Sequence, residues 1–89
     1  MRVESTNDYK KFKLLKENRV INPHHVKQLT TSILSNNMLS ENPIIVNERF
    51  EVIDGQHRLA VCRRNDLTVY YMVKKGATID DTIYLNATV

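Results

Sequence analysis

Residues 50–64 read F-E-V-I-D-G-Q-H-R-L-A-V-C-R-R, which contains in order the signals of a β-strand, a tight turn and an α-helix. The aromatic and β-branched residues from Phe50 onward favour a strand, and Asp54-Gly55 is a pair typical of turns. The apolar run that follows predicts a helix over residues 56–64. The segment therefore predicts a strand that passes through a glycine directly into a helix.

The start of this expected helix has the chemistry of an anion-binding site. The first N–H groups of a helix have no partner within the helix, and the helix dipole favours negative charge beside them. His57 and Arg58 add side-chain donors, and the planar fork of Arg58 suits phosphate. We therefore expect Gly55, Gln56, His57 and Arg58 to bind phosphate. The same residues also fit an ordinary helix start, with Asp54 as N-cap and solvated charges after it.

The run I-D-G-Q-H-R-L-A at residues 53–60 resembles the central box of the ParB/sulfiredoxin superfamily, in which a strand ends in a glycine followed by basic residues and an apolar helix. Upstream, the helix start at Asn22-Pro23 and the P-I-I-V at residues 43–46 fit the same pattern in the same order. The resemblance covers roughly residues 10–75. It is to the ParB-like N-terminal domain, also called the ParB-like nuclease domain, and it implies that domain's fold.

The resemblance also implies which ligand the anion-binding site at residues 55–58 holds. ParB-type proteins bind cytidine triphosphate (CTP) there and act as clamps on DNA, sulfiredoxins hold ATP phosphates there, and other relatives are serine kinases or nucleases. ParB-like domains often carry an arginine before the first helix that faces the anion site, which here implies Arg19. Gln56 stands where sulfiredoxins have a cysteine nucleophile, so sulfiredoxin activity is not expected. His57 stands where ParB-like boxes have an arginine, which leaves one titratable and one permanent charge.

Three functions fit these residues. The first is a nucleotide- or phosphate-binding module of a bacterial or phage DNA-associated protein. Its ligand would be CTP or ATP, bound together with Mg²⁺. The second is a metal-assisted nuclease or phosphotransferase that uses Asp54 as base or ligand. The third is a protein-interaction domain without a ligand. A protein-bound metal site is not expected, because the adjacent His24 and His25 point about 100° apart on a helix.

The composition is that of one small globular domain, with 89 residues, a hydrophobic fraction of 42% and a net charge of +3. The mild positive charge permits an anionic partner without requiring one. The single cysteine, Cys62, excludes an internal disulfide and fits a reducing cytoplasm. No apolar run approaches the roughly 20 residues of a membrane span.

We expect residues 1–8, which are polar, to form a flexible arm and residues 9–89 to form one ParB-like domain. The last expected helix reaches Val89 without a stop signal. The chain is therefore expected to be the N-terminal part of a longer protein. DNA would be bound through a downstream domain or through an oligomer such as a homodimer.

Hydrophobic periodicity predicts a small α+β domain with a mixed sheet and three helices. The expected strands are residues 9–15, 43–46, 50–53 and 68–73, with a hairpin between the second and third. The expected helices are residues 22–37, 56–64 and from 78 to the end of the chain. The expected core consists of Phe12, Leu14, Leu29, Ile33, Ile44, Val46, Val52, Leu59, Cys62, Val69, Tyr71 and Ile83.

Overall fold

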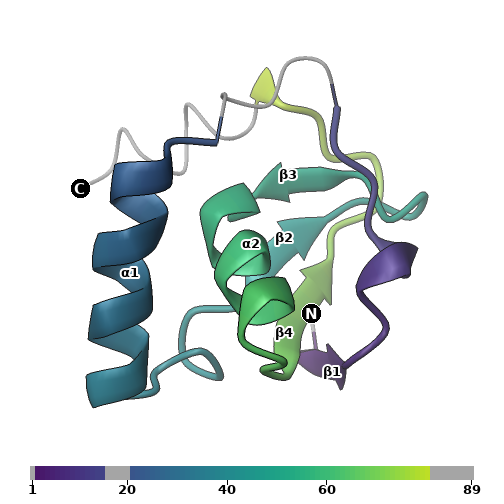
Figure 1. The fold of residues 1–89 in the computed structure, drawn as a ribbon. Helices are drawn as coiled ribbons and strands as arrows, with labels where there is room; N and C mark the ends of the chain where they lie inside the picture. The colour runs from purple at the N-terminus through teal and green to yellow at the C-terminus, as the bar shows by residue number, and fades with distance from the viewer. Residues whose placement is uncertain (1, 16–20, 81–89) are drawn as a thin grey trace.

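The structure is a computed structural model that describes residues 2–15 and 21–80. Within these residues a four-stranded sheet in the order β1-β4-β2-β3 carries α2 across one face, with α1 packed beside α2 (Figure 1). The pair β2–β4 is parallel and the other two pairs are antiparallel, which confirms the mixed α+β fold. The elements are β1 (Glu4–Thr6), the short 3₁₀ helix η1 (Tyr9–Lys11), α1 (Pro23–Ser35), β2 (Ile44–Val46), β3 (Val52–Asp54), α2 (Gln56–Arg64) and β4 (Val69–Val73).

The two α-helices and the hairpin lie where the sequence predicts them. Asn22 caps α1, because its side-chain Oδ1 accepts hydrogen bonds from the main-chain N–H groups of His24 (3.0 Å) and His25 (3.3 Å). The bounds of α2 match the predicted residues 56–64. The hairpin pairs β2 with β3, with Val46 opposite Val52. The third expected helix, beyond Thr78, lies almost entirely outside the described residues.

The hairpin turn differs from the prediction at Phe50. This residue has a φ of 59°, in the left-handed region that aromatic side chains seldom adopt, so it belongs to the turn and not to the strand. The side chain of Asn47, which is 1% exposed, holds the turn together. Its Oδ1 accepts from the N–H groups of Arg49 and Glu51, both at 3.0 Å, and its Nδ2 donates to Glu51 Oε1 at 2.7 Å.

The start of the chain also differs from the prediction. The strand expected over residues 9–15 is wrong, because residues 9–11 form η1 and Lys13 makes only an isolated parallel bridge to Glu51. The first strand is β1 instead, within the segment expected to be an arm, and it pairs antiparallel with β4. Polar strands of this kind form when a neighbouring edge supplies main-chain partners, which residue types in the segment itself do not reveal.

The core lies between the sheet and the two helices. Nine of the twelve predicted core residues are buried in it: Phe12, Ile33, Ile44, Val46, Val52, Leu59, Cys62, Val69 and Tyr71. Leu29 is partly buried against the cluster. The prediction for Leu14 is wrong, because this side chain is 50% exposed once the expected strand is replaced by a single bridge. Ile83 lies outside the described residues.

Candidate anion-binding site at the start of helix α2

Gly55 joins β3 to α2 in a conformation that other residues rarely adopt. Its φ is 103°, and a Cβ built on it would lie 2.5 Å from Ile44 Cγ2 and 2.9 Å from Arg58 Nη2. Gly55 itself is the N-cap of α2 and has no side chain to accept from the first-turn N–H groups. The alternative with Asp54 as N-cap is therefore wrong, since Asp54 is the last residue of β3.

Arg58 lies folded back over the start of its own helix, in the direction that helical side chains favour. Its Nη2 donates to the main-chain carbonyl of Pro43 at 3.4 Å and lies 3.5 Å from Asp54 Oδ2. The side chain is 27% exposed, and its buried Nε has no hydrogen-bond partner among the described residues. Arg58 therefore places a positive charge at the corner where β3 meets α2 (residues 54–58), and it links Asp54 and Pro43, the latter just before β2, to α2. Both of its polar contacts are long.

His57 connects the start of α2 to the start of α1. Its Nε2 accepts a hydrogen bond from the main-chain N–H of Asn22 at 3.3 Å. The rings of His57 and His25 are tilted by 42° to one another, with their centroids 4.5 Å apart. Since Asn22 caps α1 and Gly55 caps α2, the positive ends of two helix dipoles meet at this histidine.

The four phosphate-binding residues predicted from the sequence are therefore brought to one corner, where Gln56 is the first residue of α2. Arg19 lies outside the described residues, so its assignment stays a prediction. Sequence reasoning missed Asn22 and Pro43 as members of this corner. Asn22-Pro23 was recognisable as a helix start, but nothing local in the chain shows that it meets His57.

Asp54 is the candidate for the enzyme alternative, and the structure places it beside Arg58. Its carboxylate is the counter-ion of that guanidinium at 3.5 Å. Among residues 2–15 and 21–80 no group of three His, Cys, Asp or Glu side chains gathers as a metal site would require. The same part of the chain contains no helix long and apolar enough to cross a membrane.

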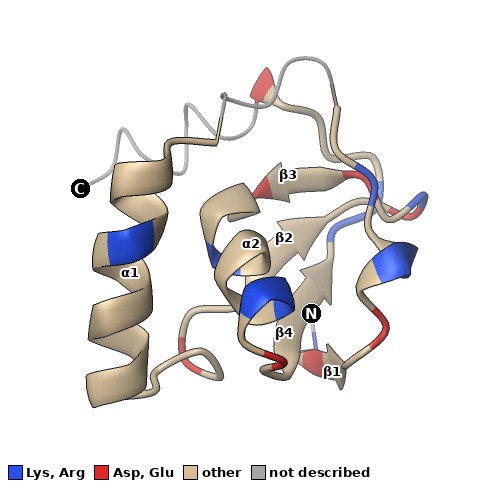
Figure 2. Cartoon of the chain, viewed as in Figure 1, with Lys and Arg blue, Asp and Glu red and all other residues tan. Residues whose placement is uncertain are grey.

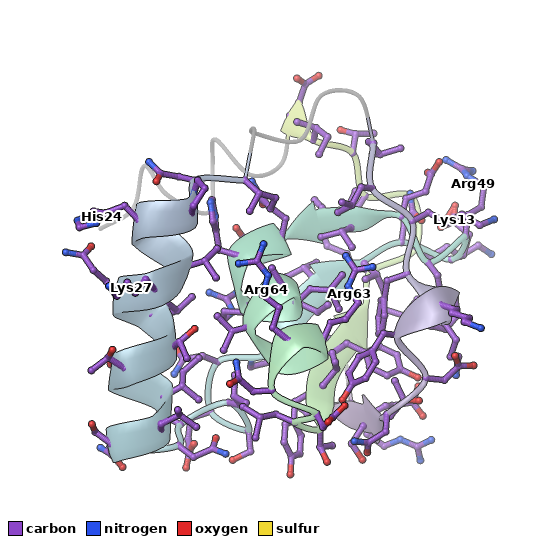
Figure 3. All side chains as sticks on the ribbon, in the orientation of Figure 1. Lys13, His24, Lys27, Arg49, Arg63 and Arg64 are labelled. Atoms are coloured by element: carbon purple, nitrogen blue, oxygen red, sulfur yellow. The ribbon has the colours of Figure 1, made fainter. Side chains whose placement is uncertain are left out.

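Among the described residues, the other basic side chains lie away from the corner (Figure 2). Arg63 and Arg64 are exposed in the last turn of α2, and Lys13 and Arg49 lie on the hairpin side of the molecule (Figure 3). Lys11 Nζ lies 5.2 Å from the centroid of the Phe50 ring, within cation–π range. The positive charge of residues 2–15 and 21–80 is thus spread over the surface and is not gathered at the corner.

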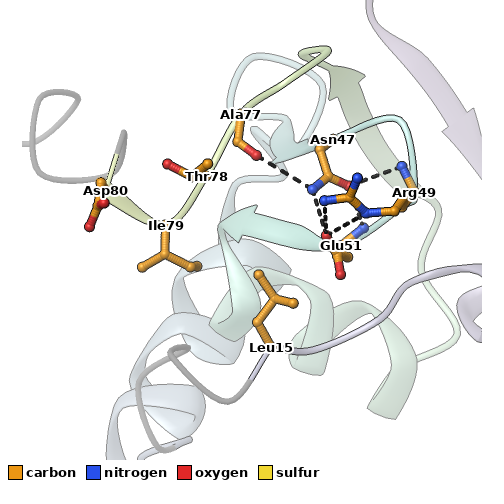
Figure 4. A pocket seen from close by; sticks show the side chains of 8 residues that line it. All are labelled: Leu15, Asn47, Arg49, Glu51, Ala77, Thr78, Ile79 and Asp80. Atoms are coloured by element: carbon orange, nitrogen blue, oxygen red, sulfur yellow. Dashed lines mark hydrogen bonds and ion pairs between the residues drawn. The ribbon is translucent and has the colours of Figure 1, made fainter.

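The structure also contains a cavity of about 260 Å³ that does not include the corner residues (Figure 4). The Asn47 cluster of the hairpin turn forms one wall. The Asn47 amide and the Arg49 guanidinium lower the pKa of the Glu51 carboxyl. The cavity is lined by Leu15, Asn47, Arg49, Glu51, Ala77, Thr78, Ile79 and Asp80.

No protein-family model and no curated protein matches the chain. The solved structures that share its fold include two ParB proteins. One is the C-terminally truncated chromosome-partitioning protein ParB from Caulobacter crescentus, complexed with CTP-γ-S, with 18% identity and a TM-score of 0.79 over the whole of this chain and 54% of that one. The other is a Pnob8-like ParB-N domain, with 17% identity and a TM-score of 0.67 over 93% of this chain and 33% of that one. The chain spans about half and about a third of these structures, and the likeness confirms the ParB-like fold predicted from the sequence.

Proposed function

We propose that this chain is a nucleoside triphosphate-binding module with CTP or ATP as its ligand, whose phosphates are held by residues 55–58. One observation carries the proposal. Gly55 leads β3 into α2 with a left-handed turn that places partly exposed residues 56–58 at a helix start, in a fold whose similar structure is complexed with CTP-γ-S.

The corner can hold a phosphate by main-chain and side-chain donors together. The first-turn N–H groups of α2 supply the main-chain donors, and the helix dipole favours the negative charge. Arg58 is already at the corner, and its long contacts to Asp54 and Pro43 are weak enough for a phosphate to compete for the guanidinium. Asp54 would then act as the group that holds Arg58 in place between binding events.

The proposal places the chain in a bacterial or phage protein that acts on DNA. DNA would be contacted through a further domain or through a homodimer, since the positive charge of the described residues is dispersed. The proposal assigns no protein-bound role to Mg²⁺, because the described residues present no group of three side chains that would hold it.

The test is calorimetric titration of the chain with CTP, ATP, GTP and UTP in the presence of Mg²⁺. We expect binding of one nucleotide, weakened about 10- to 100-fold in Arg58→Ala because charge-assisted hydrogen bonds to the phosphate are lost. Arg64→Ala is the matched control, since it removes the same charge from an exposed position at the other end of α2. Its affinity should stay within about twofold of wild type, because it removes only a distant, screened charge.

Arg58 also contacts Pro43, so each variant is first shown to be folded by circular dichroism. Arg58→Lys keeps the charge without the planar fork and should bind with intermediate affinity. Retention of wild-type affinity in folded Arg58→Ala would refute the proposed site. Absence of binding by the folded wild-type chain would favour the ligand-free interaction domain, and nucleotide turnover that is lost in Asp54→Asn would favour the enzyme.

A further inference from the structure

We propose that Asp54 is an internal competitor for Arg58, so that a nucleotide phosphate binds by displacing the Asp54 carboxylate and binds less tightly for that reason. The inference rests on the proposed function and names the residue that limits nucleotide affinity at the same site. It starts from the contact between the two side chains, in which Arg58 Nη2 lies 3.5 Å from Asp54 Oδ2. A carboxylate of the chain itself thus already stands beside the group that a phosphate needs.

The guanidinium of Arg58 lies directly at the start of α2. A Cβ added to Gly55, which is the N-cap of this helix, would be 2.9 Å from Arg58 Nη2. The same nitrogen makes the contacts with Asp54 and with the carbonyl of Pro43, and the side chain is 27% exposed. A phosphate bound by the first-turn N–H groups would therefore lie within reach of this guanidinium.

The Asp54 carboxylate is an anion that the chain itself places at this corner. Asp54 ends β3 and directly precedes Gly55, so its negative charge lies beside a helix start, where the helix dipole stabilises it. Its partner among the described residues is the Arg58 guanidinium, and the carboxylate is 34% exposed. Asp54 therefore stands in for the anionic ligand toward Arg58 while the nucleotide is absent.

Arg58 has a second contact that holds it at the corner. The carbonyl of Pro43, just before β2, accepts from Nη2 at 3.4 Å. A long side chain on a helix also favours the direction back over the preceding turn. Removal of the Asp54 charge therefore leaves the guanidinium at the helix start with a neutral partner and with one anion fewer beside it.

Two effects of Asp54 oppose the ligand. A phosphate has to replace the carboxylate as the charged partner of Arg58, which costs the free energy of a partly exposed ion pair. The bound phosphates are then repelled by the carboxylate, and this repulsion acts on each negative charge of the ligand. Both effects disappear when residue 54 is neutral. The second is larger for CTP than for CMP, because CTP carries more negative charge.

The test is calorimetric titration of the wild-type chain, Asp54→Asn and Asp54→Ala with CTP in the presence of Mg²⁺, after circular dichroism has shown each chain to be folded. We expect both variants to bind CTP about 3- to 30-fold more tightly than the wild type. Asp54→Ala shows that the gain does not come from the amide donor of asparagine. Titration with CMP should give a smaller gain. Should ATP prove the better ligand in the nucleotide panel, ATP and AMP replace CTP and CMP.

Asp66→Asn is the matched control, because it makes the same change at an exposed position just after the other end of α2. The nine residues of α2 span about 13 Å, which exceeds the screening length of about 10 Å in about 0.1 M salt. Its CTP affinity should therefore stay within about twofold of wild type. Equal gains in Asp66→Asn and Asp54→Asn would reflect net charge alone and would overturn the inference.

The double variant Asp54→Asn/Arg58→Ala tests whether Asp54 acts through Arg58. Competition for the guanidinium requires Arg58, so the gain from Asp54→Asn should be smaller when Arg58 is already alanine. An equal gain in the two backgrounds would show that Asp54 acts on the ligand alone, and it would overturn the competition.

The outcomes separate the inference from the proposed function. Unchanged or weaker CTP binding by folded Asp54→Asn, together with wild-type binding that weakens in Arg58→Ala, would overturn the competition and leave the nucleotide site standing. Failure of the wild-type chain and both Asp54 variants, all folded, to bind any nucleotide would overturn both.

Discussion

Gly55 is the residue on which the corner depends, because it meets two separate requirements. Its φ of 103° strains any side chain, and a Cβ would clash with Ile44 Cγ2 at 2.5 Å. Gly76 has only the positive φ, which is 77°, because nothing lies within 4 Å of a Cβ added to it. The two glycines therefore separate backbone strain from close packing in one molecule.

We predict that Gly55→Ala lowers the free energy of unfolding by about 2–4 kcal/mol, of which about 1–2 kcal/mol is left-handed backbone strain and the rest overpacking against β2. Gly76→Ala should lose only the strain, about 1–2 kcal/mol. Urea denaturation followed by circular dichroism measures both. Equal losses in the two variants would show that the contact between Gly55 and Ile44 imposes no packing constraint.

At the scale of the element, the hairpin turn between β2 and β3 is organised by one buried amide. Asn47 accepts from two main-chain N–H groups and donates to Glu51 and to the carbonyl of Ala77. The turn therefore binds the segment after β4 as well as its own strands. This arrangement also supports the left-handed conformation of Phe50, whose N–H donates to the carbonyl of Asn47 at 2.9 Å.

We predict that Asn47→Ala lowers the free energy of unfolding by about 2–4 kcal/mol, because it leaves two partly buried main-chain N–H groups without acceptors and removes a buried amide. The exposed Asn42, which donates to the carbonyl of Met38 at 3.0 Å, is the matched control. Asn42→Ala should cost no more than about 1.5 kcal/mol. Urea denaturation gives both values, and hydrogen exchange should show faster exchange at Phe50. Losses of similar size would mean that the Asn47 amide does not organise the turn.

At the scale of the whole molecule, Cys62 reports on the integrity of the core. Its side chain lies between α2 and β4, where Sγ is 3.8 Å from the carbonyl of Thr68. Burial raises the pKa of the thiol from 9.0 to about 11, and the nearby charge of Arg58 opposes this only in part. A neutral, enclosed thiol reacts only when the domain opens.

We predict that a disulfide reagent modifies Cys62 in the native chain at least about 100-fold more slowly than in the urea-unfolded chain, since the raised pKa alone reduces the thiolate by about that factor. Gly55→Ala should speed the reaction in proportion to its loss of stability, because both depend on the same opening. A saturating nucleotide should slow it, because binding stabilises the folded state. Rapid modification of the native wild-type chain would show that the core around Cys62 is open.

The sequence by itself determined the features that rest on local interactions. The cap at Asn22, the bounds of α2, the hairpin and most of the core follow from spacing, capping and turn chemistry, which act over a few residues. The glycine corner belongs with these features, because a strand, a glycine and a helix are consecutive in the chain. The ParB-like fold followed from the order of such features.

Only the tertiary structure decided which distant groups meet. Strand β1 forms because β4 offers it an edge, and Tyr9 and the residues after it bend away into η1 instead of pairing. Asn22 reaches His57 across 35 positions of the chain, and Arg58 reaches Pro43 across 15. Such contacts depend on how the helices pack against the sheet. They cannot be predicted from the residue types of one segment, because those reflect only local interactions.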